Sequence, residues 1–112
     1  MTSEELAAIK ARAEAATPGP WELASASSGY SNESDVISQD LGVVAHDVLN
    51  NTAVFIAHAR TDVPALVAEV ERLRALCQRG GKLLNDAWYD APAGTISDVK
   101  ALAGELEVAG RE

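Results

Sequence analysis

The stretch VPALVAEVERLRALC, residues 63–77, carries the pattern that decides the fold. Its apolar side chains recur at alternating steps of three and four residues, the heptad spacing of a helix that packs along one stripe. The glycine pair at 80–81, in the same phase, either ends this helix or lies within it as a weak point. The pattern predicts a long helix that packs against other copies of the chain, and the candidate interface residues are Val63, Leu66, Val70, Leu73, Cys77 and Leu84.

The first half of the chain predicts a helix followed by a small sheet. Residues 1–16 are rich in alanine, and Thr2 with Glu5 has the spacing of a capping box. The segment TPGP at 17–20 then ends the helix, because proline restricts the residue before it to an extended conformation. Apolar and polar residues alternate in much of residues 21–48, which predicts two or three short antiparallel strands.

Two helices are predicted between the sheet and the end of the heptad stripe. Residues 50–60 form a short helix, and a new helix begins near Asp62, because Pro64 is tolerated in a first turn. A further helix is expected at the C-terminal end. The sequence therefore predicts an α+β fold, one compact domain in which residues 1–62 hold the helix, sheet and short helix and residues 63–112 form a helical oligomerisation region.

Charge and composition restrict the partners. Acidic residues outnumber Lys plus Arg 17 to 9, and the net charge of −8 disfavours nucleic acid and anionic membranes, which both attract a basic face. No apolar run approaches the roughly 18 residues that span a bilayer, and no apolar signal segment is present at the N-terminus. Cys77 is the single cysteine, so no intramolecular disulfide is possible. We expect a cytoplasmic protein with no nucleic-acid or membrane partner.

No set of residues has the spacing of a catalytic or metal site. His46 and Asp47 with His58 lack the further ligands that a metal centre needs. Cys77 lies on the heptad stripe, where a small apolar residue is expected, and the serines of residues 25–31 lack the strand–turn–helix context of a hydrolase nucleophile. The sequence predicts no enzyme, no metal and no cofactor.

The stretch FIAHARTDVP, residues 55–64, groups a histidine, an arginine and an aspartate. A structural corner between two helices explains most of it, since an imidazole at His58 can pair with Asp62 four residues on. The alternative is a binding role, in which cationic and aromatic side chains hold an anionic or polar ligand. The candidate ligand-binding residues are Trp21, Tyr30, His58 and Arg60.

Two segments suggest a family. AATPGPW at 15–21 and AVFIAHARTDVPALVAEVERLR at 53–74 together resemble the Ead-like early proteins of lambdoid phages and their actinobacterial relatives. The resemblance implies a small phage or prophage accessory protein in the cytoplasm of a bacterial host, which interacts with the host and is not an enzyme. It covers the first 74 residues and supplies no catalytic residues. The positions that it carries over look structural, and they are Trp21, Phe55, Ile56, Pro64 and Leu66.

Three functions are consistent with these features. The first is a non-catalytic, oligomeric accessory protein that binds a host component, for instance in counter-defence. The second is a sponge that sequesters a nucleotide-type immune signal in pockets between subunits, although residues 21–48 contain no Lys or Arg to bind phosphate. The third is a coiled-coil adaptor with a purely structural role.

Overall fold

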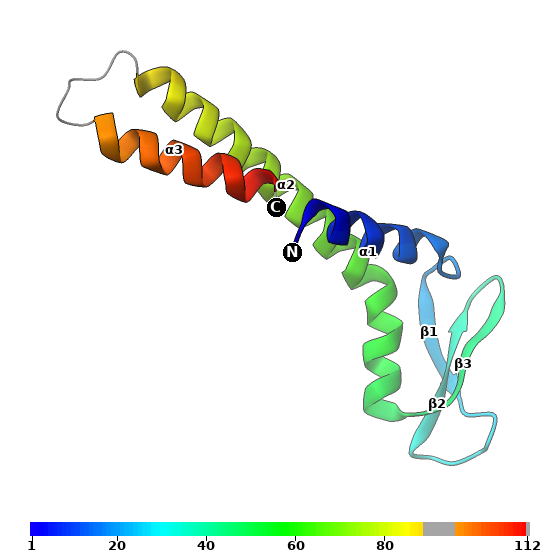
Figure 1. Cartoon of the computed structure of the whole chain (residues 1–112). Helices are drawn as coiled ribbons and strands as arrows, with labels where there is room; N and C mark the ends of the chain where they lie inside the picture. The colour runs from blue at the N-terminus through cyan, green and yellow to red at the C-terminus, as the bar shows by residue number, and fades with distance from the viewer. Residues whose placement is uncertain (89–95, 112) are drawn as a thin grey trace. The chain divides into compact units, whose positions relative to one another are not determined.

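The computed structural model describes residues 1–88 and 96–111 and confirms the α+β class. The described chain divides into two compact units, which we call the sheet unit (residues 8–66) and the helical unit (residues 1–7 and those from Val67 onward). The first seven residues therefore group with the helices and not with the sheet. The elements are α1 (Ser3–Ala15), β1 (Trp21–Ser25), β2 (Glu33–Ser38), β3 (Gly42–Leu49), α2 (Asn50–Trp88) and α3 (Ile96–Arg111) (Figure 1).

Helix α2 differs from the prediction of two separate helices. It is one helix of 39 residues that passes through Pro64 and through the glycine pair at 80–81. Pro64 has no N–H to donate to the carbonyl of Arg60, so the helix lacks one hydrogen bond there. The prediction of a new helix start near Asp62 is therefore wrong. It took Pro64 as the mark of a first turn, but a proline also fits inside a helix when the hydrogen bonds around it persist.

The predicted capping box at the start of α1 is confirmed. The backbone N–H of Glu5 donates to Thr2 Oγ1 at 3.1 Å, and the Thr2 N–H donates to Glu5 Oε2 at 2.8 Å. These reciprocal bonds satisfy two donors that the helix itself cannot pair.

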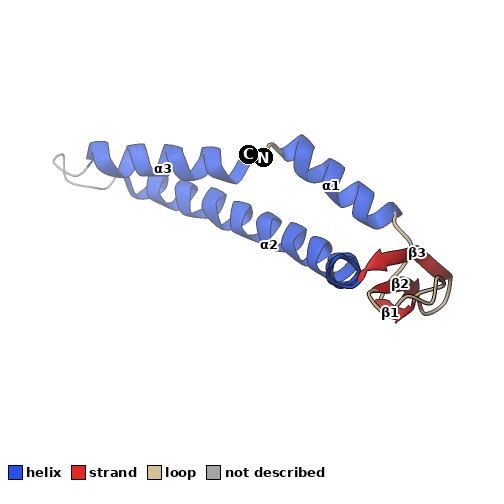
Figure 2. Ribbon diagram, turned by 90° about the horizontal axis from the view of Figure 1, so that it is seen from below, coloured by secondary structure: helices blue, strands red, loops and turns tan. Residues whose placement is uncertain are grey.

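The three strands form one antiparallel sheet in the order β1-β2-β3, with β2 in the centre (Figure 2). The turn between β2 and β3 occupies residues 39–41 and is followed by Gly42, whose φ of 91° requires a residue without a side chain. Because β2 pairs on both edges, it is the most buried strand, and three of its six residues are buried. The predicted antiparallel strands are confirmed.

The core of the sheet unit lies between β2 and the first turns of α2. Val36 is fully buried, and it packs with Ala53 and Ala57, whose small side chains let the helix lie close to the sheet. Trp21 covers one side of this core, and its indole N–H donates to the carbonyl of Thr17 at 3.0 Å. This bond holds the segment between α1 and β1 against the first residue of β1.

In the helical unit, α3 runs beside the C-terminal half of α2 (Figures 1 and 2). Glycines allow this approach: a Cβ atom at Gly81 would lie 2.7 Å from the carbonyl oxygen of Ala103, and one at Gly110 would lie 2.6 Å from that of Arg74. Asn85 Nδ2 donates to a carboxylate oxygen on α3 at 2.8 Å. The glycine pair at 80–81 therefore marks a helix contact and not a helix end.

The face of α2 that other parts of the chain cover is not quite the face that the heptad pattern predicts. At every second position of the predicted stripe, the covered residue is the next one along the helix. Val67 and Gly81 are buried, while Leu66 and Leu73 are exposed. At the position after Leu73, the guanidinium of Arg74 donates to the carbonyl of Met1. Four of the predicted interface residues are half-buried within the chain, namely Val63, Val70, Cys77 and Leu84.

Candidate functional site

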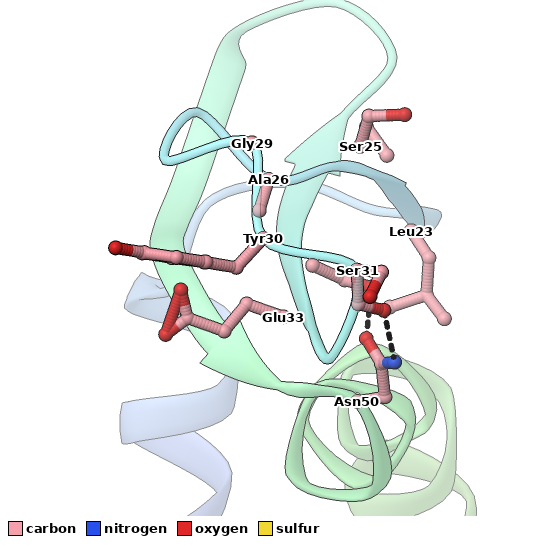
Figure 3. A pocket seen from close by; sticks show the side chains of 10 residues that line it. Leu23, Ser25, Ala26, Gly29, Tyr30, Ser31, Glu33 and Asn50 are labelled. Carbon is pink, nitrogen blue, oxygen red and sulfur yellow. Dashed lines mark hydrogen bonds between the residues drawn. The ribbon is translucent and has the colours of Figure 1, made fainter.

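A cavity of about 440 Å³ opens in the sheet unit between β1, the loop that joins β1 to β2, and the first residue of α2 (Figure 3). Leu23 and two alanines give it an apolar side, and backbone and serine hydroxyl groups give it a polar one. None of its lining residues is a lysine or an arginine. The cavity therefore offers little to a phosphate group.

Asn50 joins the loop, the sheet and the helix at one end of this cavity. Its Nδ2 donates to the carbonyl of Ser31 at 3.1 Å, and its Oδ1 accepts the hydroxyl of Ser34 at 2.6 Å (Figure 3). Its backbone N–H donates to the carbonyl of Asn32 at 3.1 Å. Because two of these bonds hold the loop and the third holds β2, this wall of the cavity is formed before any ligand binds.

Tyr30 and Glu33 give the cavity its chemical character. Figure 3 shows the phenol ring and the carboxylate on the same side of the cavity. Glu33 Oε1 accepts the hydroxyl of Ser28 at 2.8 Å, which leaves its second oxygen available to a ligand, and Tyr30 is 69% exposed. A carboxylate beside an aromatic face attracts cations, so this arrangement suits an ammonium or guanidinium group.

A second, smaller cavity of about 330 Å³ lies between β1 and α2 and brings Trp21 and His58 together. The Nδ1 of His58 lies 2.9 Å from the carbonyl oxygen of Val54, one helical turn earlier, and donates to it. The histidine is thus held by its own helix, and the bond that the structure gives it is not the expected one to Asp62.

Arg60 lines neither of these cavities. Its side chain lies over Gly19, where an added Cβ atom would be 2.8 Å from the Arg60 Cγ. Its Nε is buried and makes no hydrogen bond with the described residues. Of the four predicted ligand contacts, the structure brings Trp21 and His58 together, places Tyr30 in the larger cavity, and leaves Arg60 apart from both.

A polar cluster that the sequence did not predict surrounds the buried Asp35 of β2. A β-bulge in β3 sets two residues, His46 and Asp47, opposite it, and Asp47 has a φ of 53° there. Asp35 accepts the Ser27 hydroxyl at 2.5 Å, the Ser27 N–H at 3.2 Å and the Asp47 N–H at 2.9 Å. These residues come from three separate segments, so no local spacing in the sequence signals the cluster.

The hydrogen bonds around Asp35 keep its carboxylate charged. The Ser27 hydroxyl first, and then the Asp47 N–H, lower the pKa of Asp35 to about 2, while its burial opposes the shift and nearby His46 adds to it. The Nδ1 of His46 lies 3.2 Å from the Ser27 oxygen and 3.6 Å from the Asp35 carboxylate. In a catalytic triad the histidine lies between the serine and the acid and uses a different nitrogen for each. Here one nitrogen faces both, and the serine bonds directly to the acid.

Among the described residues, no group of three or more histidine, cysteine, aspartate or glutamate side chains is arranged to hold a metal ion. Within the same part of the chain, no helix combines the length and apolar character needed to cross a bilayer. Comparison with protein-family models, with curated proteins and with solved structures finds no match to this chain.

Proposed function

We propose that the protein is a non-catalytic binding module that works as an oligomer. The observation that carries this proposal is a row of exposed leucines along α2, which we call the leucine stripe. Apolar side chains at helical spacing on a water-exposed face are typical of a protein interface. Its members are Leu66, Leu73, Leu76 and Leu83, with 64%, 46%, 41% and 69% of their surface exposed.

The small core supports the same proposal. The buried apolar side chains of the described residues belong to three alanines, two valines and one leucine. A chain with so little buried apolar surface gains stability when it covers further surface against another chain. Covering the leucine stripe would supply large side chains that the interior lacks.

The cluster around Asp35 supports a non-catalytic role. Its serine donates to a carboxylate whose pKa is about 2, and such a carboxylate is too weak a base to activate the hydroxyl. The same bonds explain why the cluster exists, because they pair the backbone N–H groups of Ser27 and of the bulge residue Asp47. We therefore interpret it as structural.

Light scattering after size-exclusion chromatography tests the proposal. The 11.7 kDa chain should elute as a particle of at least twice that mass. Leu76→Glu should shift the particle to the monomer mass, because it places a charge in the leucine stripe. Ala75→Glu changes an exposed neighbour that points to the other side of the helix, and it should leave the mass unchanged. A wild-type monomer at high micromolar concentration would contradict the proposal.

The larger cavity suggests the chemistry of the bound partner. Tyr30 and Glu33 suit a lysine or arginine side chain of a partner protein better than the phosphates of a nucleotide. A nucleotide sponge would need cations from a second subunit beside Trp21 or Tyr30, and that hypothesis stays a prediction. Isothermal calorimetry with lysine- and arginine-containing peptides and with cyclic nucleotides distinguishes the two, with Glu33→Gln expected to weaken only the former.

The proposed biological setting is a phage or prophage accessory protein in the host cytoplasm, active in host interaction or counter-defence. It rests on the resemblance of residues 15–21 and 53–74. Purification of the tagged protein from a bacterial host, with Glu33→Gln as the matched variant, tests it. A host protein that accompanies the wild type and is depleted from the variant would support the setting, and no difference between the two would count against a role for the cavity.

A further inference from the structure

The four leucines of the leucine stripe are spaced symmetrically along α2. Leu66 and Leu73 occupy one heptad position of α2, and Leu76 and Leu83 occupy the other. Three of them belong to the helical unit, and Leu66 directly precedes that unit on the same helix. The four positions are symmetric about the midpoint between residues 74 and 75, so the spacing reads the same in both directions along the helix.

We infer that two copies of the chain pair through this stripe with their α2 helices antiparallel. This inference rests on the proposed self-association and specifies its geometry. A two-fold axis at the midpoint sets Leu66 against Leu83 of the second copy and Leu73 against Leu76 of the second copy. Antiparallel coiled coils pair unlike heptad positions in this manner, and a two-fold interface requires a surface that is complementary to itself.

The two polar or small positions inside the stripe favour the antiparallel direction. Glu69 and Gly80 lie at equal distances from the midpoint, so the antiparallel pair sets each glutamate opposite a glycine, next to Leu106 of α3, and not opposite a second glutamate. A parallel pair in register would place Glu69 against its own copy and Gly80 against its own copy. The first of these contacts is repulsive, because it removes two like charges from water at the same place.

Charges around Glu69 agree with this direction. Within the chain, Glu69 already accepts two hydrogen bonds from Arg72, at 2.9 and 2.6 Å. The exposed Arg79 adjoins Gly80, so in the antiparallel pair it approaches Glu69 of the second copy. Each glutamate in the interface thereby meets arginines from both chains, which offsets the cost of removing its charge from water.

The packing inside the helical unit leaves this face open. Helix α3 contacts α2 through Gly81, through the backbone around Arg74 and, with Leu106, at Gly80, so it borders the stripe on one side. The four leucines themselves keep 41–69% of their surface exposed, so a second copy of α2 can cover them beside α3.

Cross-linking of cysteine variants tests the direction. Leu66→Cys and Leu83→Cys are each made in a Cys77→Ala background and treated, alone and as a mixture, with a short bismaleimide. The antiparallel pair brings residue 66 close only to residue 83 of the second copy, so a cross-linked dimer should form in the mixture and not in either variant alone. Light scattering on the same samples measures the mass before the reagent is added.

Each other outcome overturns the inference in a distinguishable way. Cross-linking of each variant with itself would show parallel pairing. A dimer by mass that cross-links in no sample would show that the copies meet through another surface, and the proposed oligomeric module would stand. A monomer by mass would overturn both the inference and the self-association on which it rests.

A charge reversal tests the register. Arg79→Glu should raise the dimer dissociation constant about fivefold or more, since it turns an attraction to Glu69 of the second copy into a repulsion. Adding Glu69→Lys to this variant should restore most of the lost affinity. Lys82→Glu makes the same change of charge on an exposed part of the helix outside the stripe and should have little effect. Equal effects of Arg79→Glu and Lys82→Glu would contradict the register.

Discussion

The sheet unit and the helical unit obtain their stability in different ways. In the sheet unit, a central strand pairs on both edges and buries Val36 under two alanines of α2, and the neighbouring Asp35 accepts hydrogen bonds from a loop and from the bulge in β3. In the helical unit, backbones meet directly at glycines, and large leucines are left outside. Large apolar side chains stay exposed in both units, among them Phe55 in the first and Leu83 in the second. Under the proposed self-association, a second copy of the chain covers the leucines of the second unit.

The largest expected effect lies in the sheet unit, at Val36. Val36→Ala should destabilise the protein by about 2 kcal/mol, because it opens a cavity in a fully buried site. Urea unfolding measures the change, and hydrogen exchange should show that the amides of β2 and β3 lose protection before those of α3. Val43→Ala, at a β3 residue that is half exposed, is the matched control and should cost well under 1 kcal/mol. Equal losses of unfolding free energy in the two variants would contradict the central position of Val36 in the core.

The helical unit is tested by a pair of glycine substitutions. Gly81→Ala should destabilise it by roughly 1–3 kcal/mol, because the added Cβ would lie 2.7 Å from the Ala103 carbonyl and 3.0 Å from the Glu107 N. Gly104→Ala meets nothing within 4 Å and should stabilise α3 by about 0.5–1 kcal/mol through helix propensity. Thermal unfolding by circular dichroism measures both. Stabilisation by both alanines would mean that the helices are not in close contact at Gly81.

These two units also differ in how far the sequence predicts them. The capping box, the strands and the final helix follow from local patterns, which is why they are confirmed. The covered stripe of α2 includes Arg74 and not Leu73, although both suit a helical face locally. Contacts from distant parts of the chain decide between them, because Arg74 donates to the Met1 carbonyl and Gly110 of α3 packs against the Arg74 backbone. The role of Gly81 is hidden from the sequence for the same reason, because it depends on contact with Ala103, which lies 22 residues away in the sequence.

The candidate site shows the same limit. Aromatic character alone makes Tyr30 a candidate ligand contact in the sequence, whereas the structure adds Glu33 and Asn50 to the same cavity. Nothing in the residues around Asp35 predicts its partners, because a bulge in β3 brings His46 and Asp47 to it. Side chains that meet through a sheet register are hidden from any pattern that is read along one strand.

A smaller and pH-dependent effect is expected at Asp35. Its pKa in the folded protein is about 2, below the ordinary 3.8, so the charged group stabilises the fold above that ordinary value and this contribution is lost as the pH falls from 3.8 towards 2. Asp35→Asn removes the contribution. Urea unfolding should show the wild type more stable than the variant at neutral pH, with the gap narrowing towards pH 2. A gap that stays constant over this range would contradict the lowered pKa.

The smallest expected effect is at the start of α1. Thr2→Ala should cost about 0.5–1 kcal/mol, since it removes the side-chain acceptor for the Glu5 N–H. Thr61→Ala, inside α2 and exposed, removes a hydroxyl without removing a cap and should be neutral or slightly stabilising. Thermal unfolding compares the two. An effect at Thr61 larger than that at Thr2 would show that the cap contributes little.

The proposed self-association through the leucine stripe is tested most directly by sedimentation equilibrium of the wild-type protein in the micromolar range. Self-association through the leucine stripe predicts a mass of twice 11.7 kDa that falls towards 11.7 kDa on dilution, and a monomer under all conditions for Leu76→Glu. A wild-type chain that stays at 11.7 kDa at every concentration would contradict the claim that its exposed leucines are there to meet a second copy.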